Sequence, residues 1–417
     1  MEEASILRLN DYCLLEIFSY LNIWELIQVE QVCERFQNLI QVIYARQWKK
    51  LDFYQLKKEM NISFFSTEAQ VIAEKVGEHV KELKIVLDND EDHLYEWMHN
   101  LIRPIRPILL NCFENLERLH IEALEGFNFG ENMEILNGIY HQLESLQLIK
   151  CNLSDNMIDG LEFAANLRIL NLSINLDIRG SFLPFLRNIE EVSLSKCFSV
   201  DPTNLADMFR NNPSIRSLDI AYCKQINQEC INSLSRNLQN LEILGIGENK
   251  PVNLRNLADL PKLIQLLLYC GGINDLEAFL ERLAARDQLE YLNVTFLLDS
   301  DALKSIKKFS KLKYLRINTG DNGDLLSLLK DLSCKDNLVE LDIGGSTNVN
   351  SEDVLKCVKS CKALKVLNVE YCEDITDRFV TDLLPHLSSR SGLLEIRTHH
   401  SGITENLTVK HPKLKLN

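Results

Sequence analysis

The sequence lacks a long hydrophobic run. No apolar stretch in its 417 residues approaches the roughly 18 residues that a membrane-spanning helix needs, so no membrane partner is expected. The first residues, Met1 to Ser5, are acidic and lack the basic and apolar regions of a secretory signal. Without such a signal, the 12 cysteines indicate reduced thiols, and we expect a protein of the cytoplasm, the nucleus or both.

An excess of positive charge is also absent. The chain has 45 Lys and Arg against 60 Asp and Glu, which gives a formal net charge of -15. Because this charge repels phosphate backbones, nucleic acid is not an expected partner. Hydrophobic residues make up 46% of the chain and charged residues 25%, which permits a continuous core and argues against global disorder.

Catalytic and cofactor-binding motifs are missing as well. There is no glycine-rich phosphate loop, His-Glu-x-x-His or Gly-x-Ser-x-Gly, so no cofactor and no catalytic residue is predicted. Cys357 and Cys361 are one helical turn apart and Cys372 follows them. No fourth ligand has a suitable spacing, so no structural zinc is expected. We therefore expect a protein that is not an enzyme. A hydrolase with a Cys–His pair on the repeat surface stays a less favoured alternative.

What the sequence does have is a repeat. The phrase Leu-x-x-Leu-x-Leu, with conservative replacements, occurs thirteen times, and from Leu116 onward its copies begin 22 to 29 residues apart. The copies begin at Val80, Leu116, Leu143, Leu167, Ile189, Ile215, Leu241, Leu263, Leu289, Leu312, Leu338, Leu364 and Leu393. In each copy the second and third apolar side chains point inward from one short strand.

One repeat unit cannot bury its own apolar face, whereas stacked units can. Amphipathic stretches between the copies, such as residues 230–238, indicate an outer helix. The sequence therefore predicts an α/β leucine-rich-repeat solenoid of about 13 repeats over residues 80–417. We expect a horseshoe with parallel strands on its concave side, helices on its convex side and a C-terminal cap. The stretch after Leu393 is expected either to seal the last repeat or to fold over the concave face.

Four cysteines occupy the same place in their repeats. Cys151, Cys197, Cys223 and Cys372 each come eight residues after the first apolar position. This pattern resembles the cysteine-containing subclass of leucine-rich repeats, in which Asn or Cys at this place satisfies backbone groups of a turn. We expect buried and inert thiols here, not disulfides.

Residues 1–50 do not follow the repeat. Leu14, Ile17, Phe18 and Leu21 are spaced as an apolar stripe on one helix. A second helix that carries Leu26 should begin at Asn22, with Glu25 completing a capping box, and a third apolar series contains Cys33, Phe36 and Ile40. Three short helices bury little area, so a partner is expected to complete this core.

This segment resembles an F-box over residues 6–51. The resemblance rests on Leu9, Leu14, Leu15, Ile17, Phe18, Leu21 and Leu26, followed by Val32, Cys33, Phe36 and Trp48. It implies that the seven residues from Leu9 to Leu26 named above contact a Skp-type adaptor. This adaptor joins the chain to cullin and RING subunits. Val32, Cys33, Phe36 and Trp48 are expected to brace the module internally. Asn10 stands where the family usually has proline.

An F-box followed by leucine-rich repeats resembles the substrate receptors of SCF-type cullin-RING ubiquitin ligases. The resemblance implies an F-box over 1–51, a helical linker or cap over 52–79 and the solenoid over 80–417. It also implies that the repeats bind a target protein for ubiquitination and proteasomal degradation. A repeat scaffold that binds proteins without promoting their degradation is the alternative.

The target is expected on the concave face of the C-terminal half. Positions 3, 5, 7 and 8 of each repeat face this side, and aromatic residues and Arg are typical interface anchors. Earlier repeats carry small residues there, such as Ser193, Ser195, Ala221 and Gly247. The alternative is that the larger side chains are scattered surface residues. The predicted contacts are Tyr269, Tyr291, Phe296, Tyr314, Arg316, Glu370, Tyr371, Arg397, His399 and His400.

Overall fold

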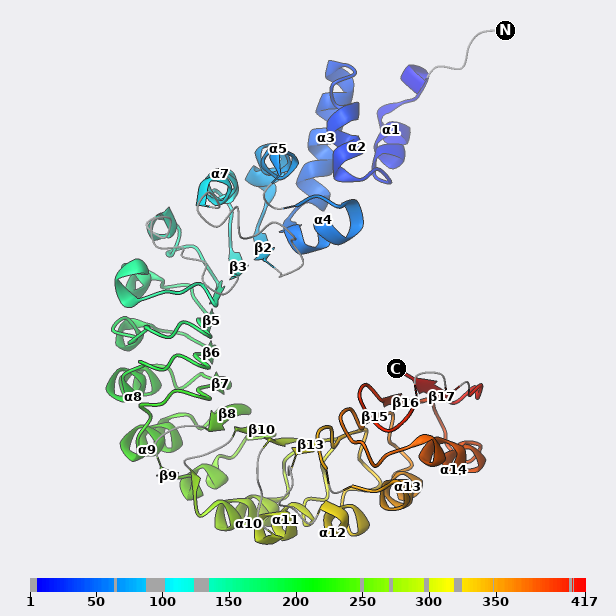
Figure 1. Cartoon of the computed structure of the whole chain (residues 1–417). Helices are drawn as coiled ribbons and strands as arrows, with labels where there is room; N and C mark the ends of the chain where they lie inside the picture. Colours follow the sequence, from blue (N-terminus) through cyan, green and yellow to red (C-terminus); the bar gives the residue numbers. More distant parts are fainter. Residues whose placement is uncertain are drawn as a thin grey trace. The chain divides into compact units, whose positions relative to one another are not determined.

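The computed structural model describes most of the chain, in two compact units, Met1–Ile189 and Glu190–Asn417. The elements of both units are labelled in Figure 1. The described residues are 6–63, 66–87, 102–123, 135–247, 251–269, 273–295, 300–318, 325–347, 349–404, 407 and 409–417.

The first unit begins with three helices, α1 (Asp11–Phe18), α2 (Ile23–Val29) and α3 (Glu34–Gln47), preceded by the turn η1 (Ile6–Arg8). Asn10 caps α1, because its side chain accepts a hydrogen bond of 2.9 Å from the backbone N–H of Cys13.

The capping box predicted at the start of α2 is confirmed. The Asn22 side chain accepts from the Glu25 N–H at 3.0 Å, and the Glu25 carboxylate accepts from the Asn22 N–H at 2.9 Å.

After α3 the chain joins the repeat sheet directly. Strand β1 (Lys50–Asp52) pairs in parallel with β2 (Glu82–Val86), and between them lie α4 (Phe53–Met60), α5 (Thr67–Val76) and the turn η2 (Gly77–His79). The stretch predicted as a helical linker therefore lies between two paired strands. The sheet starts one strand earlier than the first recognisable phrase at Val80.

The rest of the first unit continues the same parallel sheet from β2 to β5. The outer segments of its last repeats are short 3-10 turns in place of α-helices. The remaining elements are α7 (Ile102–Cys112), β3 (Arg118–Glu122), β4 (Ser145–Ile149), η4 (Asp155–Met157), η5 (Leu161–Phe163), β5 (Ile169–Asn171) and η6 (Leu183–Phe185).

The described residues of the second unit form ten parallel strands in chain order, with β9 (Val252–Asn253) and β11 (Ile273–Asn274) forming a separate pair. The ten strands are β6 (Glu191–Ser193), β7 (Ser217–Asp219), β8 (Ile243–Gly247), β10 (Gln265–Tyr269), β12 (Tyr291–Thr295), β13 (Tyr314–Asn318), β14 (Glu340–Asp342), β15 (Val366–Asn368), β16 (Leu394–Arg397) and β17 (Leu414–Leu416).

Helices cover one side of this sheet, and within the second unit Figure 1 shows them outside the curved row of strands. They are α8 (Pro202–Asn211), α9 (Gln228–Asn237), η7 (Arg255–Asp259), α10 (Leu276–Arg286), α11 (Ser300–Ile306), α12 (Leu325–Lys330), α13 (Ser351–Ser360) and α14 (Asp377–Leu387). No helix in the described ranges is long and apolar enough to cross a membrane.

The repeat prediction is confirmed, because each of the thirteen phrases contains one of the strands β2 to β16 of the main sheet. The register places equivalent residues side by side, as in Leu244, Leu266 and Leu292, and all three are fully buried. Stacked leucines thus form the core of a leucine-rich-repeat solenoid.

In several repeats the residue after the turn is buried and holds the turn together. Asn175 donates to the carbonyls of Leu148 and Leu172 at 2.7 and 2.8 Å. Cys223 and Cys372 donate from Sγ to the carbonyl of the preceding repeat, and burial raises the pKa of both thiols. Every cysteine in the described ranges is free, so the cysteines in these turns are buried thiols as predicted.

The residue immediately before this position has a left-handed backbone. Its φ is positive in seven repeats, although only Gly345 lacks a Cβ. The others are Lys150, Ile174, Lys196, Tyr222, Tyr371 and His400. The turn therefore fixes the backbone of a side chain that follows each concave strand.

The C-terminal stretch adds a strand to the last repeat. β17 pairs in parallel with β16, and the Asn417 carbonyl accepts from the Thr398 N–H at 2.8 Å. Of the two alternatives left open for this stretch, the structure shows the one in which it seals the final repeat.

Candidate protein-binding surfaces

The N-terminal module has an apolar core of its own. Leu14, Phe18 and Leu26 are 0, 2 and 0% exposed, and the Phe18 ring packs edge-on against Phe36 with centroids 4.9 Å apart. Because Leu14 and Phe18 are four residues apart on α1, both point to the inner side of the bundle. These three residues, which were predicted to contact the adaptor, are therefore buried in this structure. They brace the module internally.

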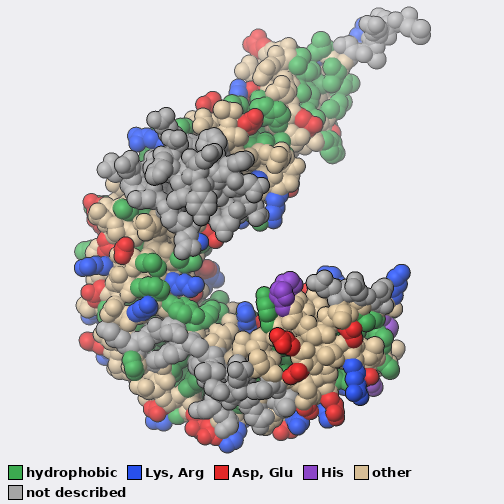
Figure 2. Space-filling view, viewed as in Figure 1, with side chains coloured by type: hydrophobic (Ala, Val, Ile, Leu, Met, Phe, Trp, Pro, Cys, Tyr) green, Lys and Arg blue, Asp and Glu red, His purple; other side chains and the backbone are tan. Residues whose placement is uncertain are grey.

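The outer side of the module is also apolar. Leu9 and Ile17 are 37 and 42% exposed, and Leu15 and Leu21 are half-buried, so these four predicted residues reach the surface. Tyr12, Tyr20 and Val32, at 80, 80 and 64% exposed, extend the set. Val32 was expected inside, and the sequence prediction missed the two tyrosines. Figure 2 shows hydrophobic side chains gathered over these helices.

Arg35 holds the N-terminal segment against α3. Its guanidinium donates to the carbonyls of Leu7 and Leu9 at 2.9 and 2.6 Å and to the Asp11 carboxylate at 2.8 Å. These bonds fix the backbone on which the exposed side chains of Leu7 and Leu9 are carried. The exposed apolar surface is therefore built on an ordered backbone.

The module is joined to the first repeat by a buried carboxylate. Glu30, at the end of α2, forms a salt bridge of 2.5 Å with Lys75 on α5 and accepts a hydrogen bond of 3.3 Å from the Tyr44 hydroxyl. Tyr44 is fully buried. Together with the pairing of β1 and β2, this contact leaves no free linker between the module and the repeats.

On the strand face of the second unit, several predicted residues come together. The rings of Tyr291 and Tyr314 lie 5.9 Å apart on neighbouring strands, and burial raises the pKa of Tyr291. Arg316 Nε lies 3.2 Å from Asp342 Oδ2, and Arg397 Nη1 lies 3.7 Å from Glu340 Oε1. These aromatic and charged side chains lie on strands β12, β13, β14 and β16.

A second group lies at the last repeats. The Tyr371 ring is 6.2 and 5.0 Å from the rings of His399 and His400, and all three side chains are exposed. Glu370 is half-buried beside them. Phe296 lies outside the described residues.

Tyr269 pairs with a residue that the sequence prediction missed. Its ring lies 5.5 Å from the ring of Tyr222, the left-handed residue after β7. The small residues Ala221 and Gly247 that suggested an empty surface here are buried. The signal that could have found Tyr222 is its place immediately before Cys223, the same place that Tyr371 has before Cys372.

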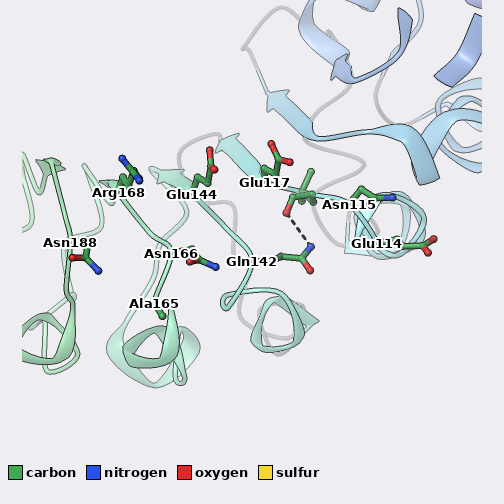
Figure 3. Close-up of a pocket in the computed structure, with 10 residues that line it drawn as sticks. Glu114, Asn115, Glu117, Gln142, Glu144, Ala165, Asn166, Arg168 and Asn188 are labelled. Carbon is green, nitrogen blue, oxygen red and sulfur yellow. Dashed lines mark hydrogen bonds between the residues drawn. The ribbon is translucent and has the colours of Figure 1, made fainter. Parts of the chain in front are cut away.

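The first unit has an open cavity of about 530 Å³ at the edge where its strands begin (Figure 3). Gln142 in its wall donates to the carbonyls of Phe113 and Leu116 at 2.6 and 3.0 Å, and Glu144 is paired with Arg118. These polar groups join neighbouring repeats, so the cavity is lined by structural contacts.

No metal-ligand cluster of three His, Cys, Asp or Glu side chains occurs in the described ranges. Cys357 and Cys361 are close, with Sγ atoms 3.9 Å apart, and both are buried.

Comparison with protein families identifies the N-terminal module. Residues 6–44 match the model of the F-box domain. A search of curated proteins gives no match. Among solved structures, a chain of the Rad7 and Elc1 complex from yeast is similar in fold, with 17% identity, a TM-score of 0.53 and coverage of 100% of this chain and 98% of that chain.

Two further structures have lower TM-scores. An internalin (inlF) from Listeria monocytogenes has 20% identity and a TM-score of 0.41. The match covers 75% of this chain and 86% of the internalin chain. A leucine-rich-repeat protein from Leptospira interrogans has 14% identity and a TM-score of 0.37, with coverage of 80% and 99%.

The fold and the matched domain together define an adaptor class of protein, in which a helical docking domain precedes a repeat solenoid. The chain combines an F-box domain with a leucine-rich-repeat fold. F-box domains bind Skp1-type adaptors, so the module at the N-terminus indicates a role as an adaptor or scaffold.

Proposed function

We propose that this protein is the substrate-recognition subunit of an SCF-type ubiquitin ligase. In this proposal residues 1–51 bind the Skp-type adaptor and, through it, the cullin and RING subunits. Residues 80–417 hold the target protein, and residues 52–79 join the two parts. The observation that carries the proposal is an F-box with an exposed apolar surface that is built directly onto leucine-rich repeats.

The adaptor is proposed to cover the outer side of α1. Leu9 and Ile17, with Tyr12, Tyr20 and Val32, expose apolar area that has no packing partner within the module. Aromatic and aliphatic side chains of this kind are typical anchors of protein interfaces, because their burial removes apolar area from water. Leu15 and Leu21 are half-buried and are proposed to lie at the margin of the contact.

The target protein is proposed to bind the strand face of the second unit. This surface combines exposed aromatic rings with Arg and His side chains, which suits a protein partner better than a small apolar ligand. The proposed contacts are Tyr269, Tyr291, Tyr314, Arg316, Glu370, Tyr371, Arg397 and His399, and by sequence alone Phe296.

The chain itself would perform no bond chemistry. Holding a target beside the ubiquitin-transfer machinery turns an encounter in solution into a reaction at high effective concentration. A direct join between docking module and repeats serves this role, because a flexible linker would lower that concentration.

Co-purification with a Skp-type adaptor tests the docking half of the proposal. The double variant Ile17→Asp with Tyr20→Asp places two charges on the outer side of α1 and should abolish binding. Leu110→Asp is the matched control, because Leu110 is 52% exposed on α7, outside the F-box. The docking assignment is wrong if the wild-type chain does not bind, or if the double variant binds as well as the control.

A scaffold that does not promote degradation is the second candidate, favoured by the same binding surfaces. The two differ in the fate of bound proteins. Proximity labelling with the intact chain and with a version that lacks residues 1–51 identifies partners, and their half-lives are then measured in cells with and without the protein. Half-lives that lengthen without the protein support a ligase receptor, whereas unchanged half-lives support the scaffold.

A further inference from the structure

Asp219 ends β7 on the strand face of the second unit, and its role in the turn needs only one of its oxygens. Its Oδ1 accepts a hydrogen bond of 3.0 Å from the Ala221 N–H. Asn171 and Asn368 accept the same bond in their own repeats, from Ser173 and Glu370. Because an amide oxygen serves this turn as well as a carboxylate does, the fold does not require a negative charge at Asp219.

Asp342, the aspartate at the equivalent position of a later repeat, has a cationic partner that Asp219 lacks among the described residues. Asp342 accepts from the Gly344 N–H at 2.9 Å, and its other oxygen lies 3.2 Å from Nε of Arg316 on the neighbouring strand. Asp219 is half-buried and Asp342 is buried, but in the described ranges no Lys or Arg forms a salt bridge with Asp219. Burial raises the pKa of Asp219, because the carboxylate loses water without gaining a cation.

The neighbouring strands offer Asp219 no cation at its register position. Ser193 on β6 has the place beside Asp219 that Arg316 has beside Asp342, and a serine carries no charge. On the other side Gly245 on β8 is the registered partner, and the Asp219 carboxylate lies directly over it, because a Cβ atom on this glycine would be 2.5 Å from Asp219 Oδ1.

Two tyrosine rings border the same place. Tyr222 is fixed by its left-handed backbone, and its ring lies 5.5 Å from that of Tyr269. Burial, and then the nearby Asp219 carboxylate, raise the pKa of Tyr269. Lys196 Nζ lies 5.6 Å from the Tyr222 ring centroid, so one tyrosine already contacts a cation on one side.

We propose that Asp219, Tyr222 and Tyr269 form a seat for one cationic side chain, an arginine or a lysine, of the protein that the repeats bind. This inference rests on the proposed function, because the occupant belongs to the captured protein. The cation would form an ion pair with Asp219 like the one that Arg316 forms with Asp342. The tyrosine rings would add a cation–π contact. Arginine is favoured over lysine, because its planar fork pairs with a carboxylate and stacks on a ring at the same time.

Binding of a minimal probe to the full-length chain tests the seat. N-acetyl-arginine amide and the neutral N-acetyl-citrulline amide are compared by ligand-observed NMR. The arginine probe should bind at least about tenfold more tightly, because only it carries the charge that pairs with the carboxylate. This comparison uses the wild-type chain and needs no variant.

Asp219→Asn should weaken binding of the arginine probe by about tenfold or more. The variant keeps the turn bond, as Asn171 and Asn368 do, so it should fold. Glu229→Gln is the matched control. It removes the same charge from an exposed site on α9 and should leave binding unchanged. The proposal is overturned if citrulline binds as well as arginine, or if Asp219→Asn binds the arginine probe like the control.

Failure of the seat and failure of the proposed function give different results. Asp219→Asn should still co-purify with the Skp-type adaptor, because the F-box is unchanged. If the wild-type chain binds the arginine probe but no adaptor, the seat stands and the ligase role does not. If it binds the adaptor but shows no preference for arginine over citrulline, the ligase role stands and the seat does not.

Discussion

Lys75 on α5 places its Nζ 2.5 Å from Oε1 of Glu30 at the end of α2, and so joins the first repeat to the F-box. The Glu30 side chain is 3% exposed and that of Lys75 is 38% exposed. The Tyr44 hydroxyl donates to the second Glu30 oxygen, and burial raises the pKa of this phenol. A buried carboxylate shared by two parts of a protein fixes how those parts are placed.

Breaking this contact from its two ends should have unequal effects. Lys75→Met leaves a buried carboxylate without a cation and should lower the free energy of unfolding by about 2 kcal/mol. Glu30→Gln should cost less, because the partly exposed Lys75 can turn to water. Urea unfolding measures both, and the double variant should recover part of the loss from Lys75→Met. A larger loss from Glu30→Gln than from Lys75→Met would contradict this account.

Asn10 should be a stabilising cap even though the family usually has proline there. Asn10→Ala removes the acceptor for the Cys13 N–H and should destabilise α1 by about 1 kcal/mol, whereas Asn10→Asp should keep the cap. Amide hydrogen exchange of α1 measures the difference. Equal exchange rates in Asn10→Ala and Asn10→Asp would show that the cap does not hold the helix.

The repeat fold could be predicted because its signal is periodic and redundant. Thirteen phrases with matching spacing define the strands, and a buried Cys or Asn recurs after the turn in several of them, as at Cys151, Asn175 and Cys223. β1 could not be predicted, because its sequence Lys50–Asp52 carries no leucine phrase and is defined by pairing with β2.

The binding surfaces were harder to predict because an apolar residue alone does not reveal which side of a helix is buried. On α1, Leu14 and Phe18 face inward while Ile17 faces outward, and all three fit one apolar stripe in the sequence. On the repeats, Tyr222 was missed because small neighbours surround it in the sequence, although the structure brings it to Tyr269 on another repeat.

Ile174 is predicted to be a strained residue. It has φ 64, in a left-handed conformation that β-branched side chains avoid, at a position where Gly345 serves in a later repeat. Ile174→Asn should raise the free energy of unfolding by about 1 kcal/mol, because Asn adopts this conformation more readily. Ile169→Asn, at a half-buried site in β5, is the control and should lower it. A loss of stability in both variants by urea unfolding would contradict the assignment of strain.

Asp155 should stabilise the protein at neutral pH. Its carboxylate accepts from the backbone N–H groups of Arg179, Gly180 and Ser181 at 2.8, 3.0 and 2.7 Å. Burial alone would raise its pKa, but these hydrogen bonds outweigh it and lower the pKa below the ordinary 3.8. The stabilisation is therefore present above pH 3.8 and lost as the pH falls through the folded-state pKa. Asp155→Asn should lower the free energy of unfolding at pH 7 by about 1 kcal/mol, measured by urea unfolding. The difference in stability between the variant and the wild type should narrow in acid.

The charge on Asp219 should destabilise the protein at neutral pH, in contrast to the charge on Asp155. Burial raises its folded-state pKa above 3.8, more than the Ala221 hydrogen bond lowers it, so the folded chain holds this proton more tightly than the unfolded chain. Stability then falls as the pH rises from 3.8 through the folded-state pKa, and the cost persists at neutral pH. Asp219→Asn keeps the turn bond and should be more stable than wild type at pH 7. The two should be equally stable at a pH low enough to protonate Asp219 in both the folded and the unfolded wild-type chain. Urea unfolding over this pH range measures the difference. A variant less stable than wild type at pH 7 would mean that the charge serves the fold, whereas a more stable one fits a carboxylate kept ready for a cation from outside the chain.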